Sequence, residues 1–261
     1  MLSKLLKNDL KKNMRWLWII FVTTIAIALL DRGCKELANN IAFFKIISII
    51  LDSVFYSLAV NTVLQPFLRN TFNFTKSFYS DESYLTHTLP VTKKQLINSK
   101  YITALIEVVT GFAVLVSSIL IMYASPSMFD TLQLLLSTVI SGNLSIYLIL
   151  ALMAIQILVE FLMFLSIIYF AIVIAYREKE QRVLKTFLIT FAMASIALTI
   201  LSIVMVIIML INGIDLASDT LILSPQAFLS IIFTGISVYS IVTVVFYFLT
   251  KKMFTKGVNV D

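Results

Sequence analysis

The sequence predicts an all-α, polytopic membrane protein with six transmembrane helices, and three observations support this fold class. Apolar residues make up 60% of the 261 residues and charged residues 13%, whereas a soluble domain has about 45–50% and about 25%. The apolar residues form long blocks, and a helix needs about 20 of them to cross the hydrocarbon core. Lysine and arginine gather in alternate connecting segments, a pattern typical of chains that cross a membrane repeatedly.

Six apolar blocks qualify as spans of one transmembrane domain that covers residues 1–261, namely residues 16–30, 46–68, 101–123, 145–175, 186–211 and 229–249. The first block is short and must borrow residues from its flanks. The fourth exceeds one crossing, which indicates a helix that is tilted, broken or longer than the bilayer is thick. No small-residue cleavage site follows the first block, so we interpret it as an uncleaved span rather than a signal peptide.

The positive charges predict an orientation. All but three of the 20 lysine and arginine residues lie before span one, between spans two and three, between spans four and five, or after span six. The exceptions, Arg32, Lys35 and Lys45, lie between the first two spans. Because cationic connections stay in the cytoplasm, we expect a multi-pass protein of the bacterial plasma membrane with both termini inside. This asymmetry also explains the basic composition without a nucleic-acid partner.

Residues 1–15 predict an amphipathic interfacial helix ahead of span one. Leucine or methionine recurs every fourth position from Leu2 to Met14, and five cations cover the remaining surface. This pattern is typical of a helix that lies in the interface with its basic side toward anionic headgroups. An unstructured basic tail is the alternative interpretation.

Residues 69–100 form the longest predicted cytoplasmic segment. Ser80 is a candidate N-cap, and Asp81 and Glu82 would lie in a first turn where the helix dipole favours acids. Pro90 would stop that helix, and Thr92 with Gln95 predicts a capping box that opens the next one. The segment therefore predicts a short helix, a sharp turn and a second helix that continues into span three. The outer segments 125–143 and 212–228 are compatible with either re-entry into the membrane or a position on its surface.

Several polar side chains lie within the spans. Ser53, Ser57, Asn61 and Gln65 are four residues apart and share one helix face, and carboxylates inside a membrane usually face protein or water. One interpretation places five residues on a translocation path, namely Asn61, Gln65, Glu107, Gln156 and Glu160. The other interpretation is that these side chains form hydrogen bonds between the helices of the bundle.

The sequence shows no catalytic motif. It has no phosphate-binding loop, no nucleophile elbow and, with His87 and Cys34 as the single histidine and cysteine, no ordinary zinc ligand set. We therefore expect a non-catalytic chain without a metal or cofactor of its own. If it transports a substrate actively, the energy comes from a partner or an ion gradient.

Residues 78–100 resemble the segment between spans two and three of type-2 ATP-binding-cassette permeases of Gram-positive bacteria. The matching positions are Phe78, Asp81, Glu82, Tyr84, Leu85, Thr88, Leu89, Pro90, Val91, Thr92, Gln95, Leu96, Ser99 and Lys100. In that family the segment holds a coupling helix, which docks on a separate nucleotide-binding subunit. The resemblance implies that this contact is made here by Ser80, Asp81, Glu82, Tyr84, Leu85, Leu89 and Pro90.

The resemblance also implies the partners. Two ATPase subunits would bind ATP and Mg²⁺, and the permease would pair as a homodimer or with a related permease. Similar permeases export amphipathic peptides, including the staphylococcal phenol-soluble modulins, or protect against antimicrobial peptides. Two alternatives remain open from the residues alone: an ion-coupled secondary transporter that uses Glu160 or Glu107, and a non-transporting immunity or scaffold protein.

Overall fold

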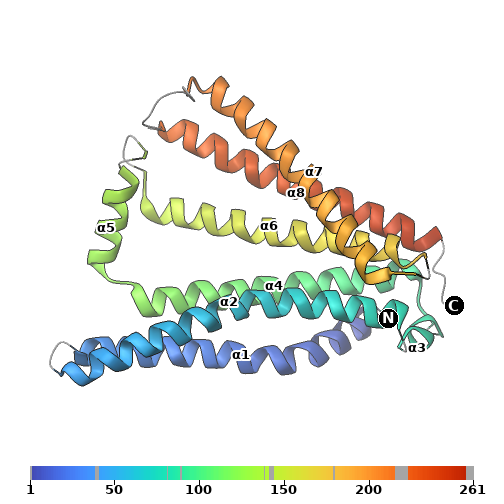
Figure 1. Ribbon diagram of the computed structural model, residues 1–261, viewed down its shortest axis with the longest axis horizontal. Helices are drawn as coiled ribbons and strands as arrows, with labels where there is room; N and C mark the ends of the chain where they lie inside the picture. Colours follow the sequence, from blue (N-terminus) through green and yellow to red (C-terminus); the bar gives the residue numbers. More distant parts are fainter. Residues whose placement is uncertain are drawn as a thin grey trace. The chain divides into compact units, whose positions relative to one another are not determined.

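The computed structural model describes residues 2–38, 41–80, 82–88, 90–137, 139–140, 144–178, 180–214 and 223–256. Within these residues the chain is all-α, as predicted, and six of its helices are long and apolar enough to cross a membrane (Figure 1). By its internal contacts the chain divides into two compact units, with the boundary between Ser125 and Pro126.

The first unit contains three long helices that lie side by side and one short helix (Figure 1). Its helices are α1 (Leu2–Ala38), α2 (Ala42–Tyr79), α3 (Ser83–Thr88) and α4 (Lys93–Tyr123). The 37 residues of α1 extend about 55 Å, well beyond a hydrocarbon core of about 30 Å. The predicted interfacial helix and span one are therefore one unbroken helix, which explains how the short first block gains length.

The three long helices approach closely at Gly111. A Cβ atom on Gly111 would lie 2.7 Å from the backbone oxygen of Thr62 and 3.2 Å from Pro66. Pro66 has no N–H to donate to the Thr62 carbonyl four residues earlier, and this same carbonyl faces Gly111. Pro66 does not end α2, which continues to Tyr79 and so extends eleven residues beyond the predicted span.

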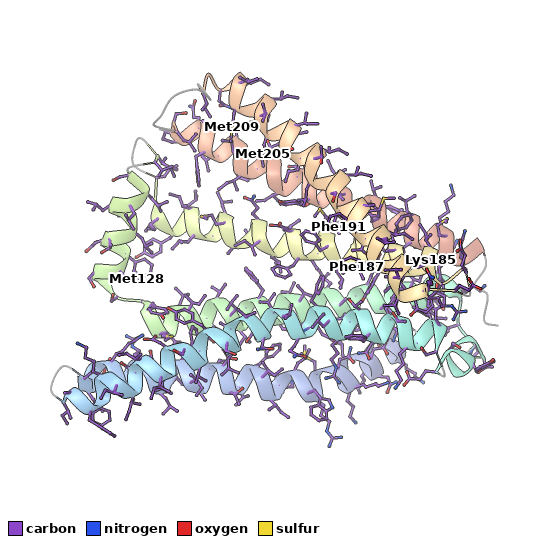
Figure 2. All side chains as sticks on the ribbon, in the orientation of Figure 1. Met128, Lys185, Phe187, Phe191, Met205 and Met209 are labelled. Carbon is purple, nitrogen blue, oxygen red and sulfur yellow. The ribbon has the colours of Figure 1, made fainter. Side chains whose placement is uncertain are left out.

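The second unit contains α5 (Pro126–Ser137), α6 (Ile146–Ala175), α7 (Arg182–Ile211) and α8 (Pro225–Lys256). α6 contacts both α7 and α8, and the shared core includes Met163, Ile167, Ala197 and Tyr239. The 30 residues of α6 form one helix of about 45 Å, so the fourth span is long rather than broken. Figure 2 shows Phe187 and Phe191 on α7, and both are about two-thirds exposed (66% and 67%).

The first outer segment contains α5, whose 12 residues extend only about 18 Å and cannot cross a bilayer. After it, Ile140 pairs with Leu223 in an isolated parallel bridge, and the Leu223 N–H donates to the Val139 carbonyl at 2.7 Å. Residues 215–222 of the second outer segment lie outside the described residues.

Candidate functional site

The short helix α3 begins later than the sequence predicted. α2 runs on to Tyr79, so Ser80 caps the end of α2 rather than the start of α3. The Ser83 N–H donates to the Ser80 carbonyl at 2.7 Å, and this turn opens α3. The predicted N-cap at Ser80 is therefore wrong, because the preceding helix occupies that position.

The end of α3 and the start of α4 follow the prediction. α3 ends at Thr88, just before Pro90, which cannot continue a helix. The predicted capping box is confirmed: Thr92 Oγ1 accepts from the Gln95 N–H at 3.3 Å, and the Thr92 N–H donates to Gln95 Oε1 at 3.2 Å. Two of the predicted coupling positions, Asp81 and Leu89, and the side chain of Leu85 lie outside the described residues.

Glu82 ties the start of α3 to two long helices. Its carboxylate lies 3.1 Å from Lys12 Nζ on α1 and 3.2 Å from Lys76 Nζ on α2. Partial burial acts to raise the pKa of Glu82, but the two ammonium groups outweigh it and lower the pKa below its usual value. We call these three residues the Glu82 junction.

The neighbouring side chains of α3 point in different directions. Ser83 is buried, with 4% of its surface exposed, whereas Tyr84 is 68% exposed. Of the predicted coupling residues, Glu82 therefore holds α3 on its own unit, and Tyr84 leaves its aromatic ring exposed.

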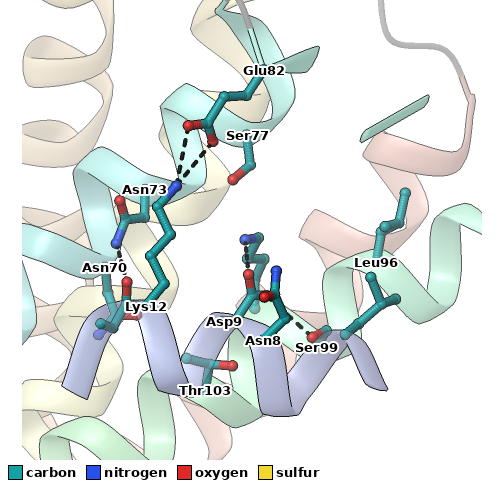
Figure 3. A pocket seen from close by; sticks show the side chains of 13 residues that line it. Asn8, Asp9, Lys12, Asn70, Asn73, Ser77, Glu82, Leu96, Ser99 and Thr103 are labelled. Atoms are coloured by element: carbon teal, nitrogen blue, oxygen red, sulfur yellow. Dashed lines mark hydrogen bonds and ion pairs between the residues drawn. The ribbon is translucent and has the colours of Figure 1, made fainter. Parts of the chain in front are cut away.

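A polar cavity of about 140 Å³ lies between α1, α2 and α4 beside the Glu82 junction (Figure 3). Asp9 on α1 pairs with Lys100 on α4 at 3.0 Å and accepts from Ser99 Oγ at 3.4 Å. Asn73 on α2 donates to Asn13 Oδ1 on α1 at 2.7 Å. The N-terminal part of α1 thus directs one polar face into its own unit. Of the cations that the sequence placed on the side toward lipid headgroups, Lys12 belongs to this inward face.

Glu107 lies deeper along the same helices and is fully buried (0% exposed). Asn70 Nδ2 donates to Glu107 Oε2 at 2.8 Å and also to the Pro66 carbonyl at 2.8 Å. Asn13 is a second amide that contacts the carboxyl group. The hydrogen bond to Glu107 Oε2 therefore comes from an uncharged amide of α2, and among the described residues Glu107 Oε1 has no hydrogen-bond partner.

The other predicted path residues lie on a different face of α2 or in the second unit. Asn61 is half-buried and donates to the Ser57 carbonyl of its own helix, and Gln65 lies on the same face of α2, away from Asn70. Gln156 and Glu160 belong to α6 in the second unit, where both are half-buried. Within that unit the Gln156 amide lies beside Gly235 of α8, since a Cβ there would be 3.1 Å from Gln156 Nε2.

A second charged cluster lies at the opposite end of the first unit and was not predicted. Lys35 Nζ on α1 lies 2.7 Å from Asp31 and 2.8 Å from Asp52 on α2. The Tyr123 hydroxyl of α4 donates to Asp52 at 3.1 Å. The spacing of Asp31 and Lys35, four residues apart on one helix, was a visible signal for their pairing. Their contact with Asp52 depends on how α1 packs against α2.

The fold and these contacts define a polytopic membrane protein with six apolar helices of spanning length and a short helix between the second and third of them. Comparisons with family models, with curated proteins and with solved structures found no match to this chain.

Proposed function

We propose that this chain is the permease subunit of an ATP-driven exporter of the type-2 ATP-binding-cassette class. The observation that carries the proposal is α3, a six-residue helix with an exposed aromatic ring at Tyr84, set between two long apolar helices. Aromatic residues are enriched among the side chains that dominate protein interfaces. A partner docked on α3 would therefore act directly on α2 and α4.

The contacts around α3 support a mechanical role. The Glu82 junction links α3 to α1 and α2, and Pro90 with the Thr92 capping box fixes the start of α4 two residues after the turn. A displacement of α3 would pass to three long helices through ion pairs and a short connection. These features are expected of a helix that transmits movement, and a plain connecting loop would not need them.

The remaining parts of the proposal concern the complex. The chain has no phosphate-binding loop, so two separate ATPase subunits supply ATP hydrolysis to a pair of permeases. Both termini lie in the cytoplasm, and the exporter belongs to the plasma membrane of a bacterium. The substrate class is an amphipathic or antimicrobial peptide, as in the permeases that residues 78–100 resemble.

The test is co-purification of an ATPase with the tagged full chain, followed by its identification and an assay of ATP hydrolysis. Tyr84→Ala should reduce the bound ATPase about 30-fold, since loss of an aromatic interface anchor costs about 2 kcal/mol or more, and Tyr84→Phe should retain it. Tyr147→Ala is the matched control, because Tyr147 is also exposed (64%) but lies on α6. Retention of the ATPase by Tyr84→Ala, with the protein still inserted in the membrane, would contradict the proposal.

The buried carboxyl group of Glu107 favours a second candidate, an ion-coupled secondary transporter. A buried ionisable group inside a membrane domain, hydrogen-bonded by an amide, is suited to carry a proton. This candidate expects substrate flux that a protonophore abolishes and that needs no ATPase. Flux driven by ATP in the absence of an ion gradient would eliminate it.

A further inference from the structure

The N-terminal part of α1 presents two different faces, and only one of them is used within its unit. Asp9, Lys12 and Asn13 face α2, α3 and α4, and all three make ion pairs or hydrogen bonds there. The four other cations in residues 4–15 are exposed, and among the described residues none of them has an ion-pair partner: Lys4, Lys7, Lys11 and Arg15. We call these four residues the basic face.

We propose that the basic face is a binding surface for the headgroups of anionic phospholipids. With 3.6 residues per turn, its four positions fall within less than a quarter of the helix circumference, so the cations act together. Lysine and arginine bind phosphate through charge-assisted hydrogen bonds. Clusters of cations beside an apolar span are a recognised feature of binding to anionic leaflets.

The continuation of the same helix face supports lipid as the occupant. Trp18, Val22 and Leu29 lie in line with the basic face at helical spacing, and they are 59%, 56% and 56% exposed. Along this one face the side chains change from cations to an indole and then to aliphatic groups. A bilayer changes in the same order, from charged headgroups through the interface to hydrocarbon. An acidic protein surface would explain the cations but not the exposed Trp18 and aliphatic residues beyond them.

The length of the basic face sets how it can meet the membrane. Lys4 and Arg15 are separated by about 16 Å along the helix, whereas one headgroup layer is only about 5–8 Å thick. Electrostatic attraction extends a further 8 Å or so at physiological salt. Lys11 and Arg15, next to Trp18, therefore lie closest to the headgroups, and Lys4 and Lys7 add attraction from the cytoplasmic side.

The chain carries its own reporter for this surface. It has two tryptophans, Trp16 and Trp18, so Trp16→Phe leaves the indole of Trp18 alone. This parent is reconstituted in vesicles of phosphatidylcholine and phosphatidylglycerol in which one lipid carries brominated acyl chains. The quenching of Trp18 by each brominated lipid then gives their relative affinities for this helix face.

We expect the helix face at Trp18 to prefer phosphatidylglycerol over phosphatidylcholine, and this preference to fall about fivefold for each cation removed. The test variant, Lys7→Gln with Lys11→Gln, removes two of the four cations. The matched control, Lys93→Gln with Lys94→Gln, removes two exposed lysines of α4 and should keep the preference. Quenching in pure brominated phosphatidylcholine should be equal in all variants, which checks insertion. High salt should abolish the preference in the parent.

Three results would overturn the inference. The first is equal quenching by both lipids in the parent, and the second is an equal loss in the control pair. The third is loss of a bound protein from the Lys7 and Lys11 variant while its lipid preference is unchanged, which would make an acidic protein the partner. The inference does not depend on export, because the measurement needs neither ATPase nor substrate.

Discussion

Lys12 Nζ lies 3.1 Å from the Glu82 carboxylate, although 70 residues separate the two in the chain. Lys76 reaches the same carboxylate at 3.2 Å. An exposed ion pair alone contributes about 0.2–1 kcal/mol, and a carboxylate shared by two cations contributes more than a single pair. The Glu82 junction therefore sets how firmly α3 is held against α1 and α2.

We expect Glu82→Gln to loosen α3 without unfolding the unit. Removal of the charge should raise hydrogen exchange in residues 83–88 up to about fivefold, which corresponds to a loss of about 1 kcal/mol. Mass spectrometry of the detergent-solubilised protein provides the measurement. Glu36→Gln is the control, because the Arg32 and Glu36 pair is longer, at 3.7 Å, and lies in α1 far from α3 in sequence. Glu82→Asp, which keeps the negative charge beside Lys12 and Lys76, should keep part of the protection, and a loss equal to that of Glu82→Gln would argue against a charge effect.

The Glu82 junction should also depend on pH in one direction. The pKa of Glu82 is lowered from an ordinary value of 4.5 by Lys12 and Lys76, against the opposing effect of partial burial. A lowered pKa means that the contribution is fully present above pH 4.5 and is lost as the pH falls through the still lower pKa of the folded protein. The ratio of exchange rates between Glu82→Gln and the parent should therefore approach one in acid. A ratio that is constant from pH 7 to pH 3 would disprove this linkage.

Local sequence rules predicted the elements better than their ends. The stop at Pro90 and the capping box at Thr92 depend on neighbouring residues only, and both are present. Ser80 was misassigned because the end of α2 was placed by hydropathy, and a helix can continue long after its apolar block ends. The same reason explains α1, where a change from polar to apolar composition at residues 15 and 16 does not interrupt the helix.

The contacts of the site could be predicted only in part. Glu107 was identified as a candidate from its position inside an apolar block. Its partner Asn70 was not identified, because their contact depends on the register between α2 and α4. The basic character of residues 4–15 was visible, but the division between Lys12, which faces Glu82, and the exposed cations around it required the packed helices.

Glu107 offers a test of structure against function at one position. Glu107→Gln keeps a carbonyl oxygen that can accept from Asn70, so we expect a change in unfolding free energy of only about 1 kcal/mol or less. Glu107→Ala leaves a buried amide without its acceptor and removes side-chain volume, which should cost about 2–4 kcal/mol. Thermal unfolding in detergent compares the two. If Glu107→Gln is as unstable as the alanine variant, the carboxylate itself is required for packing, and a path role for it loses its support.

Two helical glycines with close neighbours, Gly111 and Gly235, provide the last comparison. A Cβ on Gly111 would meet the backbone oxygen of Thr62 at 2.7 Å, and the backbone of α2 cannot move without separating from α4. A Cβ on Gly235 would meet Met205 Cε at 2.9 Å and Gln156 Nε2 at 3.1 Å, both of them ends of flexible side chains (Figure 2 labels Met205).

Replacement of a helical glycine by alanine gains about 0.5–1 kcal/mol in backbone entropy, whereas overpacking a rigid contact costs about 1–3 kcal/mol. We therefore expect Gly111→Ala to be destabilised, with a lower midpoint of thermal unfolding, and Gly235→Ala to stay close to the parent because its neighbours can change rotamer. Equal effects of the two substitutions would mean that the backbones of α2 and α4 can separate at Thr62 as easily as a side chain can change rotamer. The close approach at Gly111 would then not be a rigid feature of the first unit.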